Sequence, residues 1–421
     1  MRKLLQSKKA GSATDKNPCL RHAGAGIRGS ALVIVMLFVV ISAILGVAVL
    51  TVGAQSRIFA IRNASEIAAR CAADAGLTMA IYQMNQKLIS DKAIVGVWNT
   101  DPALLPSTTN AALPGCDTIY SYTVTKSGSD YVISSIGTCG QAQKRVTCIL
   151  DIQGPFHYAV FGNGYLWFAN GSTFDQYNTD ADTPALKAGT NTTLKGWVQI
   201  NNDSQINGDV VVGCGGDPAY VIKNQGTITG DQYALTEPQT LPSVTVPSWL
   251  ASMPSQGKLT GGDVTASGRY DKIDLGTKKT ITVKGAVTLY VTGDVSLGNE
   301  AQIIVDDTTP NSSLTLYLGD NFISHNGSNI NNLTRNPHNM EIFALDSCTK
   351  IILKNSSAFY GAIYAPKAQV LSYNSGATYG SVIAGAFGLY NTGAFHYDAS
   401  LRNATVNDPL VRFEVTQWSE N

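Results

Sequence analysis

Residues 25–54 read AGIRGSALVIVMLFVVISAILGVAVLTVGA, and this stretch decides where the rest of the chain is placed. Its apolar run, residues 31–54, contains no charged side chain. About 20 apolar residues in a helix suffice to cross a bilayer, whereas a cleaved secretory signal has an apolar region of roughly 7–15 residues and a small-residue cleavage site after it. No such site follows this run. The segment is therefore predicted to be a signal-anchor, transmembrane over about residues 31–54.

The residues that precede the apolar run are basic. Residues 1–28 contain seven Lys and Arg and a single acid, Asp15. This bias holds the preceding segment in the cytoplasm and sends the following chain across the membrane. We therefore expect a single-pass membrane protein with a cytoplasmic N-terminus.

The composition of the exported part is typical of extracellular β-structure. Beyond the leader the chain has 23 basic and 29 acidic residues, a net charge of −6, and charged residues make up only 14% of the whole sequence. Nucleic-acid binding usually needs a basic face, so none is expected. The many Gly, Asn, Ser and Thr residues favour short strands joined by tight turns.

A long helix is predicted to continue well beyond the membrane. Residues 55–88 contain no proline, and five apolar residues repeat with the spacing of one buried helix face: Leu77, Ala80, Ile81, Met84 and Leu88. A helix from Ser30 to about Leu88 would be ~90 Å long at 1.5 Å per residue. Its apolar first half cannot be buried within its own domain, so it must lie in lipid or against other copies of itself.

These features together resemble the type IV pilin-like proteins. The segments RGSALVIVMLFVVISAILGVA (residues 28–48) and RNASEIAARCAADAGLTMA (residues 62–80) are most similar to the PilX class of minor pilins. The resemblance covers about the first 90 residues and joins a leader, a cut site and a helix.

The resemblance implies how the N-terminus is processed. In that family a prepilin peptidase cuts after the glycine that ends the basic leader, and the new N-terminal residue is methylated. Here this implies a leader peptide over residues 1–29, cleavage between Gly29 and Ser30, and N-methylation of Ser30. The pilin-like helix, residues 30–90, would anchor the subunit in the inner membrane and later pack with other pilin-like subunits in a filament at the cell surface.

One position departs from the major pilins. They carry a glutamate at the fifth mature position, which is Ile34 here. A buried carboxylate needs a partner, which in major pilins is thought to be the terminal ammonium of the neighbouring subunit. PilX-class minor pilins and the tip pseudopilin of type II secretion systems resemble this chain in lacking the acid, which implies a place at the filament tip. The alternative is that Ile34 merely follows the hydrophobicity of a lipid-facing helix.

Residues 91–154 are predicted to form a linker and a small antiparallel β region. Three prolines mark the linker, and the alternating segments TIYSYTVTK, DYVISSIG and KRVTCILDI indicate a meander that packs on the helix. If the first hairpin turns at residues 126–129, Tyr122 faces Ile133 and Cys116 faces Cys139. Direct antiparallel partners lie within disulfide reach, so a Cys116–Cys139 bridge is expected. The alternatives are a bridge from Cys139 to Cys148 or free thiols.

The head, residues 155–400, is predicted to be β-rich. Related fragments recur, namely INGDVVVG (residues 206–213) and VTGDVSLG (residues 291–298), and the pairs Tyr360-Gly361 and Tyr379-Gly380 are 19 residues apart. Such repeats favour a parallel β-helix, or solenoid, whose coils stack on one another, with a β-sandwich as the second choice.

Three further segments of the exported part carry expectations. The Pro-rich residues 241–257 indicate an insertion or a loop across the solenoid. Residues 401–421 are expected to form a C-terminal tail. The segment GAFHYDASL, residues 393–401, resembles the close of a domain of unknown function found after pilin-like helices.

The sequence predicts no catalytic residue, no metal site and no cofactor. The histidines of the exported part have no metal-ligand spacing, and no C-x-x-C occurs. His396 and Asp398 share a strand face, where ordinary hydrogen-bond roles suffice. β-Helix folds host polysaccharide lyases and glycosidases, but those need clustered carboxylates, whereas the acids here are dispersed.

The chain is therefore expected to be an α+β protein, not an enzyme, that serves as a minor pilin-like subunit at the tip of a type IV pilus or related filament. A first alternative is a bacterial tip adhesin that binds extracellular glycans or surfaces through exposed aromatics such as Trp167, Trp197 and Tyr373, although packing in the solenoid core is the favoured role of each of these side chains. A second is a surface-tethered carbohydrate-active enzyme. The expected partners are other pilin-like subunits, the inner membrane before assembly, the prepilin peptidase and the glycan or surface.

Overall fold

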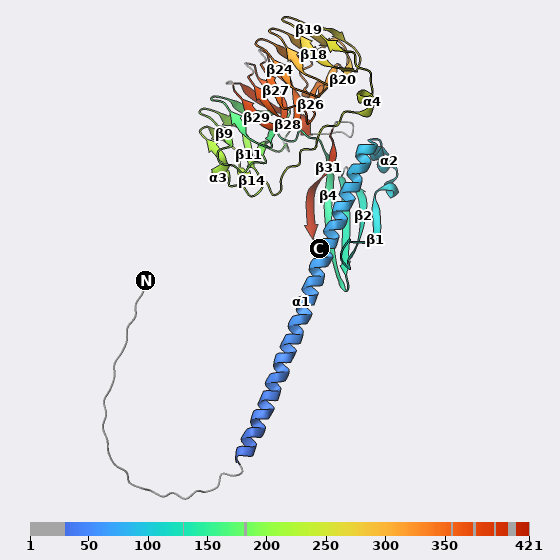
Figure 1. Cartoon of the computed structure of the whole chain (residues 1–421), viewed down its shortest axis with the longest axis vertical. Helices are drawn as coiled ribbons and strands as arrows, with labels where there is room; N and C mark the ends of the chain where they lie inside the picture. The colour runs from blue at the N-terminus through green and yellow to red at the C-terminus, as the bar shows by residue number, and fades with distance from the viewer. Residues whose placement is uncertain are drawn as a thin grey trace, which may run out of the picture.

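The computed structural model describes residues 30–420 apart from a few short gaps: residue 129 and residues 181–182, 355–356, 374–375, 391–392 and 403–409. A long N-terminal helix carries a small antiparallel sheet on its second half and a large β-rich domain beyond its end (Figure 1). The long apolar helix and the β-rich domain with parallel strands are as predicted. None of the three sheets in the described chain closes on itself. The predicted leader lies outside the described residues.

The helix α1 (Ser30–Ser90) is continuous over 61 residues, or ~92 Å. Its second half is docked: Leu77, Ala80, Met84 and Leu88 are buried as predicted, and Ile81 is half-buried. The first half, from Leu32 onward, is long and apolar enough to cross a membrane and is not buried by any other part of the described chain.

The small sheet packs on the docked half of α1. Its five antiparallel strands, in spatial order, are β1 (Ser107–Ala112), β2 (Ile119–Ser127), β3 (Asp130–Cys139), β4 (Ala142–Gln153) and β31 (Arg412–Glu420). Along the chain, α1 is followed by α2 (Ile94–Thr100) and the 3-10 turn η1 (Pro102–Leu104), and then by β1. Trp98 of α2 is fully buried against Tyr131 and Phe413.

The last strand of this sheet corrects the prediction of a C-terminal tail. Residues 412–420 form β31, which pairs antiparallel with β4, Phe413 opposite Ile152. Residues 412–420 thus complete a sheet whose other four strands come from residues 107–153. Asn85 of α1 fixes this strand, because its side chain exchanges two hydrogen bonds with the Phe413 backbone, at 2.7 and 3.1 Å.

The predicted register of the first hairpin is wrong. Ser127 pairs with Asp130, so the turn is only two residues long and begins at Gly128, whose φ of +65° suits glycine. Tyr122 consequently faces Ser135 rather than Ile133.

The same correction removes the basis of the expected disulfides. Cys116 precedes β2, and Cys139 pairs with Ala142 across the next turn. Cys148 faces Ile133, so it is not opposite Cys139 either. All three are free thiols in the structure.

The β-rich domain, called the head below, is built from short strands stacked in parallel columns, and every pair among its described strands is parallel. The first column, from one end to the other, is β14 (Gln232–Ala234), β11 (Gly208–Val212), β8 (Leu186–Thr190), β5 (Val160–Gly162), β29 (Thr378–Leu389), β28 (Phe359–Ser372), β26 (Met340–Ala344), β23 (Ser313–Leu318), β20 (Ala286–Val291) and β17 (Gly268–Tyr270). An antiparallel β-sandwich does not fit this pairing.

Two further columns run beside the first. The second is β12 (Ile222–Asn224), β9 (Val198–Ile200), β6 (Leu166–Phe168), the ends of β29 and β28, β27 (Lys350–Leu353), β24 (Phe322–Ser324), β21 (Val295–Leu297), β18 (Lys272–Leu275) and β15 (Lys258–Leu259). The third has two parts. One is β13 (Thr227–Ile228), β10 (Gln205–Ile206), β7 (Thr173–Tyr177), β30 (Ala394–Asp398) and the beginnings of β29 and β28. The other is β25 (Asn329–Asn332), β22 (Gln302–Val305), β19 (Thr280–Val283) and β16 (Gly262–Val264). Short helical turns interrupt the connections: α3 (Pro218–Val221), α4 (Ser248–Ala251), η2 (Pro337–Asn339) and η3 (Ala399–Arg402).

The chain enters and leaves the head at its middle. From β5 the strands stack outward as far as β14; residues 235–257 then run to the opposite end, past α4, and the strands stack back to β29 and β30 (Figure 1). β29 therefore pairs with β28 on one side and with β5, more than 200 residues earlier, on the other. The Pro-rich segment crosses the head, as its composition indicates.

One hydrophobic core runs through the whole head, separate from the core of the small domain. Residues in the strands alternate between buried and partly exposed, as in β20, so each strand sends one row inward. In-register stacking also orders the outer rows. Tyr360 pairs with Tyr379, their rings 4.3 Å apart and 8° from parallel, which confirms the 19-residue repeat.

Candidate functional site

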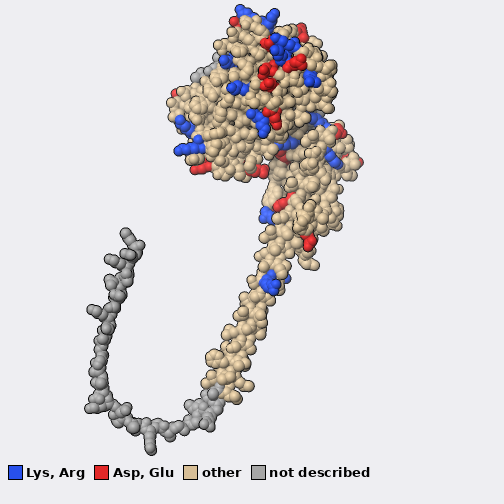
Figure 2. Space-filling model, in the orientation of Figure 1, with Lys and Arg blue, Asp and Glu red and all other residues tan. Residues whose placement is uncertain are grey.

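The first candidate site is the uncovered half of α1. Between Leu32 and Val52, sixteen large apolar side chains are exposed, and Ile34 is 53% exposed among them. Leaving one such side chain in water rather than burying it costs about 1.5–3 kcal/mol, so this surface must be covered by lipid or protein. Figure 2 shows no charged side chain on the described lower half of the helix.

Charge first appears on α1 at the exposed Arg57 and Arg62, and from Glu66 onward charged side chains of the helix pair with the small sheet. Glu66 Oε2 lies 3.8 Å from Lys144 Nζ of β4, and Arg70 Nη2 lies 3.0 Å from Glu420 Oε2 of β31. The Arg70 guanidinium also lies over the Trp418 ring, 6.0 Å from its centroid. Such exposed pairs contribute little stability, and they lie where the helix begins to pack on the small sheet.

The N-terminal sites named from the sequence fall at the edge of the structure. Ser30 is the first residue of α1. Gly29 lies outside the described residues.

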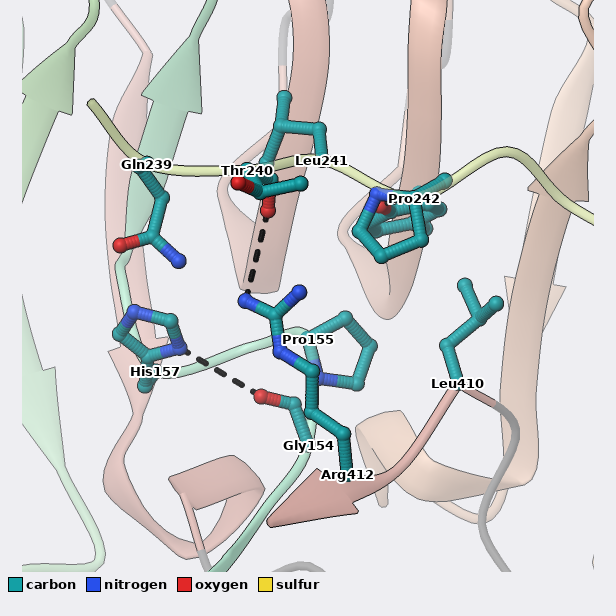
Figure 3. Close-up of a pocket in the computed structure, with 10 residues that line it drawn as sticks. Gly154, Pro155, His157, Gln239, Thr240, Leu241, Pro242, Leu410 and Arg412 are labelled. Carbon is teal, nitrogen blue, oxygen red and sulfur yellow. Dashed lines mark hydrogen bonds between the residues drawn. The ribbon is translucent and has the colours of Figure 1, made fainter. Parts of the chain in front are cut away.

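The second candidate site is the neck, where the two chain connections join the head. Residues 154–157 and 410–412 lie side by side there, and residues 239–242 cross over them as a strap (Figure 3). Arg412 Nη2 donates to Thr240 O at 3.3 Å. The strap is fixed to the head, because Asn191 exchanges hydrogen bonds of 2.7 and 2.8 Å with the Gln239 backbone.

A half-buried histidine completes the neck. His157 Nδ1 lies 3.4 Å from Gly154 O, and burial lowers the pKa of His157, so its imidazole is neutral at physiological pH. The Tyr364 hydroxyl donates to Pro242 O at 2.8 Å, and burial raises its pKa. These neutral, hydrogen-bonded groups fix the mounting of the head and leave only about 20 Å³ of space between them.

The third candidate site is an aromatic pocket on the head, lined by seven residues: Tyr165, Leu166, Trp167, Gly196, Trp197, Gln199 and Tyr390. It is open to solvent and holds about 290 Å³. Alternation along β6 buries Leu166 and Phe168 and turns Trp167 outward. The in-register neighbour of Trp167 in β9 is Gln199, whose side chain therefore also points outward.

Stacked rings form one wall of this pocket. Tyr373 lies on Tyr390, with centroids 4.8 Å apart and planes 13° apart, and Tyr390 lies on Trp167, 6.2 Å and 20° apart. Gly388 lets the Tyr390 ring fold back over the strand, because a Cβ there would meet that ring at 2.6 Å. Burial, and then the neighbouring Tyr165 hydroxyl, raise the pKa of Tyr390 to about 12, so its phenol is uncharged.

Three aromatics named from the sequence lie in or beside this pocket, although core packing was the favoured role of each. Trp167 and Trp197 line it, and Tyr373 ends its stack, but Tyr165 and Tyr390 were missed. The signal was present in the motif Tyr-Asn-Ser/Thr-Gly-Ala, which begins at Tyr373 and again at Tyr390. A repeated aromatic at equivalent places of two stacked strands predicts ring stacking.

The His-Tyr-Asp motif has ordinary hydrogen-bonding roles. His396 Nδ1 bonds Asp175 Oδ1 of the neighbouring strand, and its ring stacks on Tyr379 at 4.6 Å. Asp398 accepts from Asn178 Nδ2 at 3.0 Å and from the Ser400 hydroxyl at 2.7 Å.

His338 also reaches this group, with Nε2 3.4 Å from Ser400 Oγ. In a catalytic triad the carboxylate orients the histidine, whereas here it binds the serine. Within the described ranges no cluster of three His, Cys, Asp or Glu could hold a metal ion.

Comparison with known proteins finds a family model that matches part of the chain. Residues 223–404, less than half of the chain, match a domain of unknown function (DUF7305). This range includes GAFHYDASL, in agreement with the resemblance seen in the sequence. No curated protein matches the chain.

Three solved structures are similar to the chain at low identity. The competence-associated pilin ComZ from Thermus thermophilus is 13% identical, with 85% of this chain and 97% of that one covered and a TM-score of 0.26. A glycosylated ice-binding protein from an Arctic yeast is 12% identical (57% and 90% covered, TM-score 0.19). An ice-binding protein from an Antarctic bacterium of the Flavobacteriaceae is 9% identical (57% and 80%, TM-score 0.14). Identities and TM-scores this low carry no argument about the function of this chain.

Proposed function

We propose that the chain is a pilin-like subunit of a type IV pilus or a related surface filament. The observation that carries this proposal is a single helix with a bare apolar half and a docked amphipathic half. The bare half has to be covered, first by the lipid of the inner membrane and then by the helices of other pilin-like subunits. The docked half holds the exported domains at a fixed place on the rod.

The proposal includes processing of the N-terminus. The basic leader ends at Gly29, immediately before the first residue of α1. A prepilin peptidase that cuts there would leave Ser30 as the methylated N-terminus and the whole of α1 intact.

We further propose that the subunit is a minor pilin of the PilX type located at the filament tip. Ile34 offers no carboxylate to the terminal ammonium of a neighbouring subunit, so a place without a further subunit on that side suits it. The head is proposed to be a parallel β-helix, supported by its three stacked columns and its continuous core. Its breadth makes it poorly suited to a regular shaft.

The second candidate function is adhesion by the head. It is favoured by the aromatic pocket, where Trp197 is 41% exposed and Tyr390 is 37% exposed. We propose a binding rather than an enzymatic role. A carbohydrate-active head would instead turn over a polysaccharide, which product analysis after incubation would reveal.

The processing step provides the experiment. Wild-type chain and two leader variants, Gly29→Val and the control Gly24→Val, are expressed in the native host, and N-termini are sequenced in membranes and in sheared filaments. Wild type and Gly24→Val should begin at methylated Ser30 and enter filaments, while Gly29→Val keeps its leader and stays in the membrane. An N-terminus at Met1, or one beyond Ala54, in assembled material would contradict the proposal.

A further inference from the structure

The aromatic pocket leaves large apolar ring surface in contact with water. Trp197 and Tyr390 both line this pocket and are exposed, and the Tyr390 ring stacks on Trp167. Aromatic side chains bury 150–250 Å² each when packed, so leaving two of them exposed side by side gives up considerable free energy. A ligand that covers the rings would recover it.

The rings are held in place before any ligand arrives. The Tyr373–Tyr390–Trp167 stack is built on in-register strands and limits the rotation of each ring. Lys354 Nζ lies 6.0 Å from the Tyr373 centroid, at the far end of the stack from Trp167. A preorganised wall loses little side-chain entropy when it binds a ligand.

Polar groups on the pocket are few, neutral and located beside the rings. They are the Gln199 amide, the indole N–H groups of the two tryptophans, and the hydroxyls of Tyr390 and Tyr165. The Tyr165 hydroxyl already accepts a hydrogen bond from Gln369 Nε2. The seven lining residues include no Lys, Arg, His, Asp or Glu. The nearby Lys195 is engaged over the Tyr220 ring, 5.7 Å from its centroid. The ligand is therefore expected to be uncharged.

We propose that this pocket binds a neutral glycan. A pyranose ring presents a face of C–H groups that packs on an aromatic ring, and its hydroxyls project from the rim, where an amide and a phenol can hydrogen-bond them. The volume of about 290 Å³ is at the lower end of the range for small-ligand sites and has room for a sugar ring with its neighbours extending into solvent. Anionic sugars find no cation among the lining residues.

The pocket is placed where a filament tip could present it. It is formed by β6, β9 and the end of β29, and Figure 1 shows β9 on the flank of the head that points away from α1. Packing of α1 in a membrane or a filament therefore leaves the pocket open. This inference deepens the second candidate function, adhesion, and does not require that the chain assemble into filaments.

The test uses the full chain in a zwitterionic detergent, because sugar-based detergents would compete for the pocket. Binding of cellotetraose, chitotetraose, maltotetraose and mannotetraose is measured by calorimetry and by saturation-transfer NMR. The variants are Trp197→Ala, Gln199→Met and the control Trp249→Ala, which removes a tryptophan that is 49% exposed elsewhere on the head.

We expect at least one of the four sugars to bind wild type and Trp249→Ala equally, and Trp197→Ala to bind it about tenfold more weakly or worse. Gln199→Met keeps the shape but not the hydrogen bonds, so it should weaken binding without changing thermal unfolding. The inference is overturned if none of the sugars binds, if Trp197→Ala binds as wild type does, or if a proline-rich peptide occupies the pocket instead. Because dispersed subunits are used, failure here leaves the processing test above unaffected.

Discussion

Gly137 of β3 lies where the docked half of α1 comes closest to the small sheet. A Cβ atom at Gly137 would meet Ala69 O at 2.0 Å, Ala73 N at 2.4 Å and Ala72 Cβ at 2.9 Å. Two of these atoms belong to the helix backbone, which cannot rotate away as the end of a flexible side chain can. Since real Cβ contacts essentially never fall below 3.0 Å, Gly137→Ala must move the helix and the sheet apart by about 1 Å.

The expected cost follows from what this movement loosens. Overpacking of a tight core costs about 1–3 kcal/mol. The loss falls on the small-domain core, where Leu77 and Met84 of α1 pack with Trp98 of α2, and not on the separate core of the head. A loss of that size makes amide exchange through opening of this domain about 5–150-fold faster.

Hydrogen–deuterium exchange with mass spectrometry on the full chain measures the effect region by region. Peptides from residues 69–88 and from β2 to β4 should exchange faster in Gly137→Ala, while head peptides keep wild-type rates. The matched control is Gly96→Ala in α2, where an added Cβ meets no described atom within 4 Å and alanine is the better helix former. Wild-type exchange in Gly137→Ala, or faster exchange spread equally over the head, would refute the close-contact reasoning.

Three other predictions concern separate parts of the chain. Burial raises the pKa of Cys148 to about 11 and of Cys348 to about 12, so both thiols should resist alkylation in the native protein, while the exposed Cys214 reacts. Peptide mass spectrometry measures the modification of each cysteine, and early modification of either buried thiol would contradict the prediction. Ile34→Glu should weaken membrane insertion by about 2–3 kcal/mol at mid-membrane depth and still leave immunogold label at filament ends; label along the whole shaft would show a main structural subunit. Hydrogen bonds from two threonine hydroxyls hold the pKa of Asp306 at about 2, below its ordinary 3.8, so its carboxylate stabilises the head above about pH 4 and that contribution is lost as the pH falls through about 2. The stability difference between wild type and Asp306→Asn should therefore shrink over that interval, and a difference independent of pH in acid titrations would contradict it.

The long helix was predictable because its signals are local. Apolar spacing from Leu77 to Leu88, the absence of proline and the uncharged run from residue 31 each depend on neighbours within a few turns. The register of the first hairpin was not predictable. The observed hairpin closes with Ser127 opposite Asp130, and the predicted one closes at residues 126 and 129, so the two differ by only one position in each strand. Both alternatives keep the same faces buried, so only the left-handed backbone at Gly128 distinguishes them.

The pairing of distant strands left even less trace in the sequence. The repeat that joins Tyr360 to Tyr379 is visible because β28 and β29 follow one another in the chain and pair in register. By contrast, β29 pairs with β5, and β31 pairs with β4, across more than 200 residues. The periodicity of each strand predicts that it is a strand but does not indicate which distant strand it pairs with. For the same reason the sequence indicated single aromatic residues but not the pocket they form, since its rings come from both halves of the head.

The central mounting of the head bears on where such a subunit fits in a filament. The first column stacks ten strands, and at ~4.8 Å between neighbours it is about 43 Å long. Packed helices, by comparison, lie only about 8–10 Å apart. Because the neck joins the head near the middle of this column, the head extends to both sides of its attachment, and Figure 2 shows it far broader than the helix that carries it. Copies packed through α1 alone would bring their heads into overlap long before their helices met. The proposed position at the end of the filament, where one head has free space around it, would remove this conflict and agrees with the absence of an acid at position 34, which is Ile34.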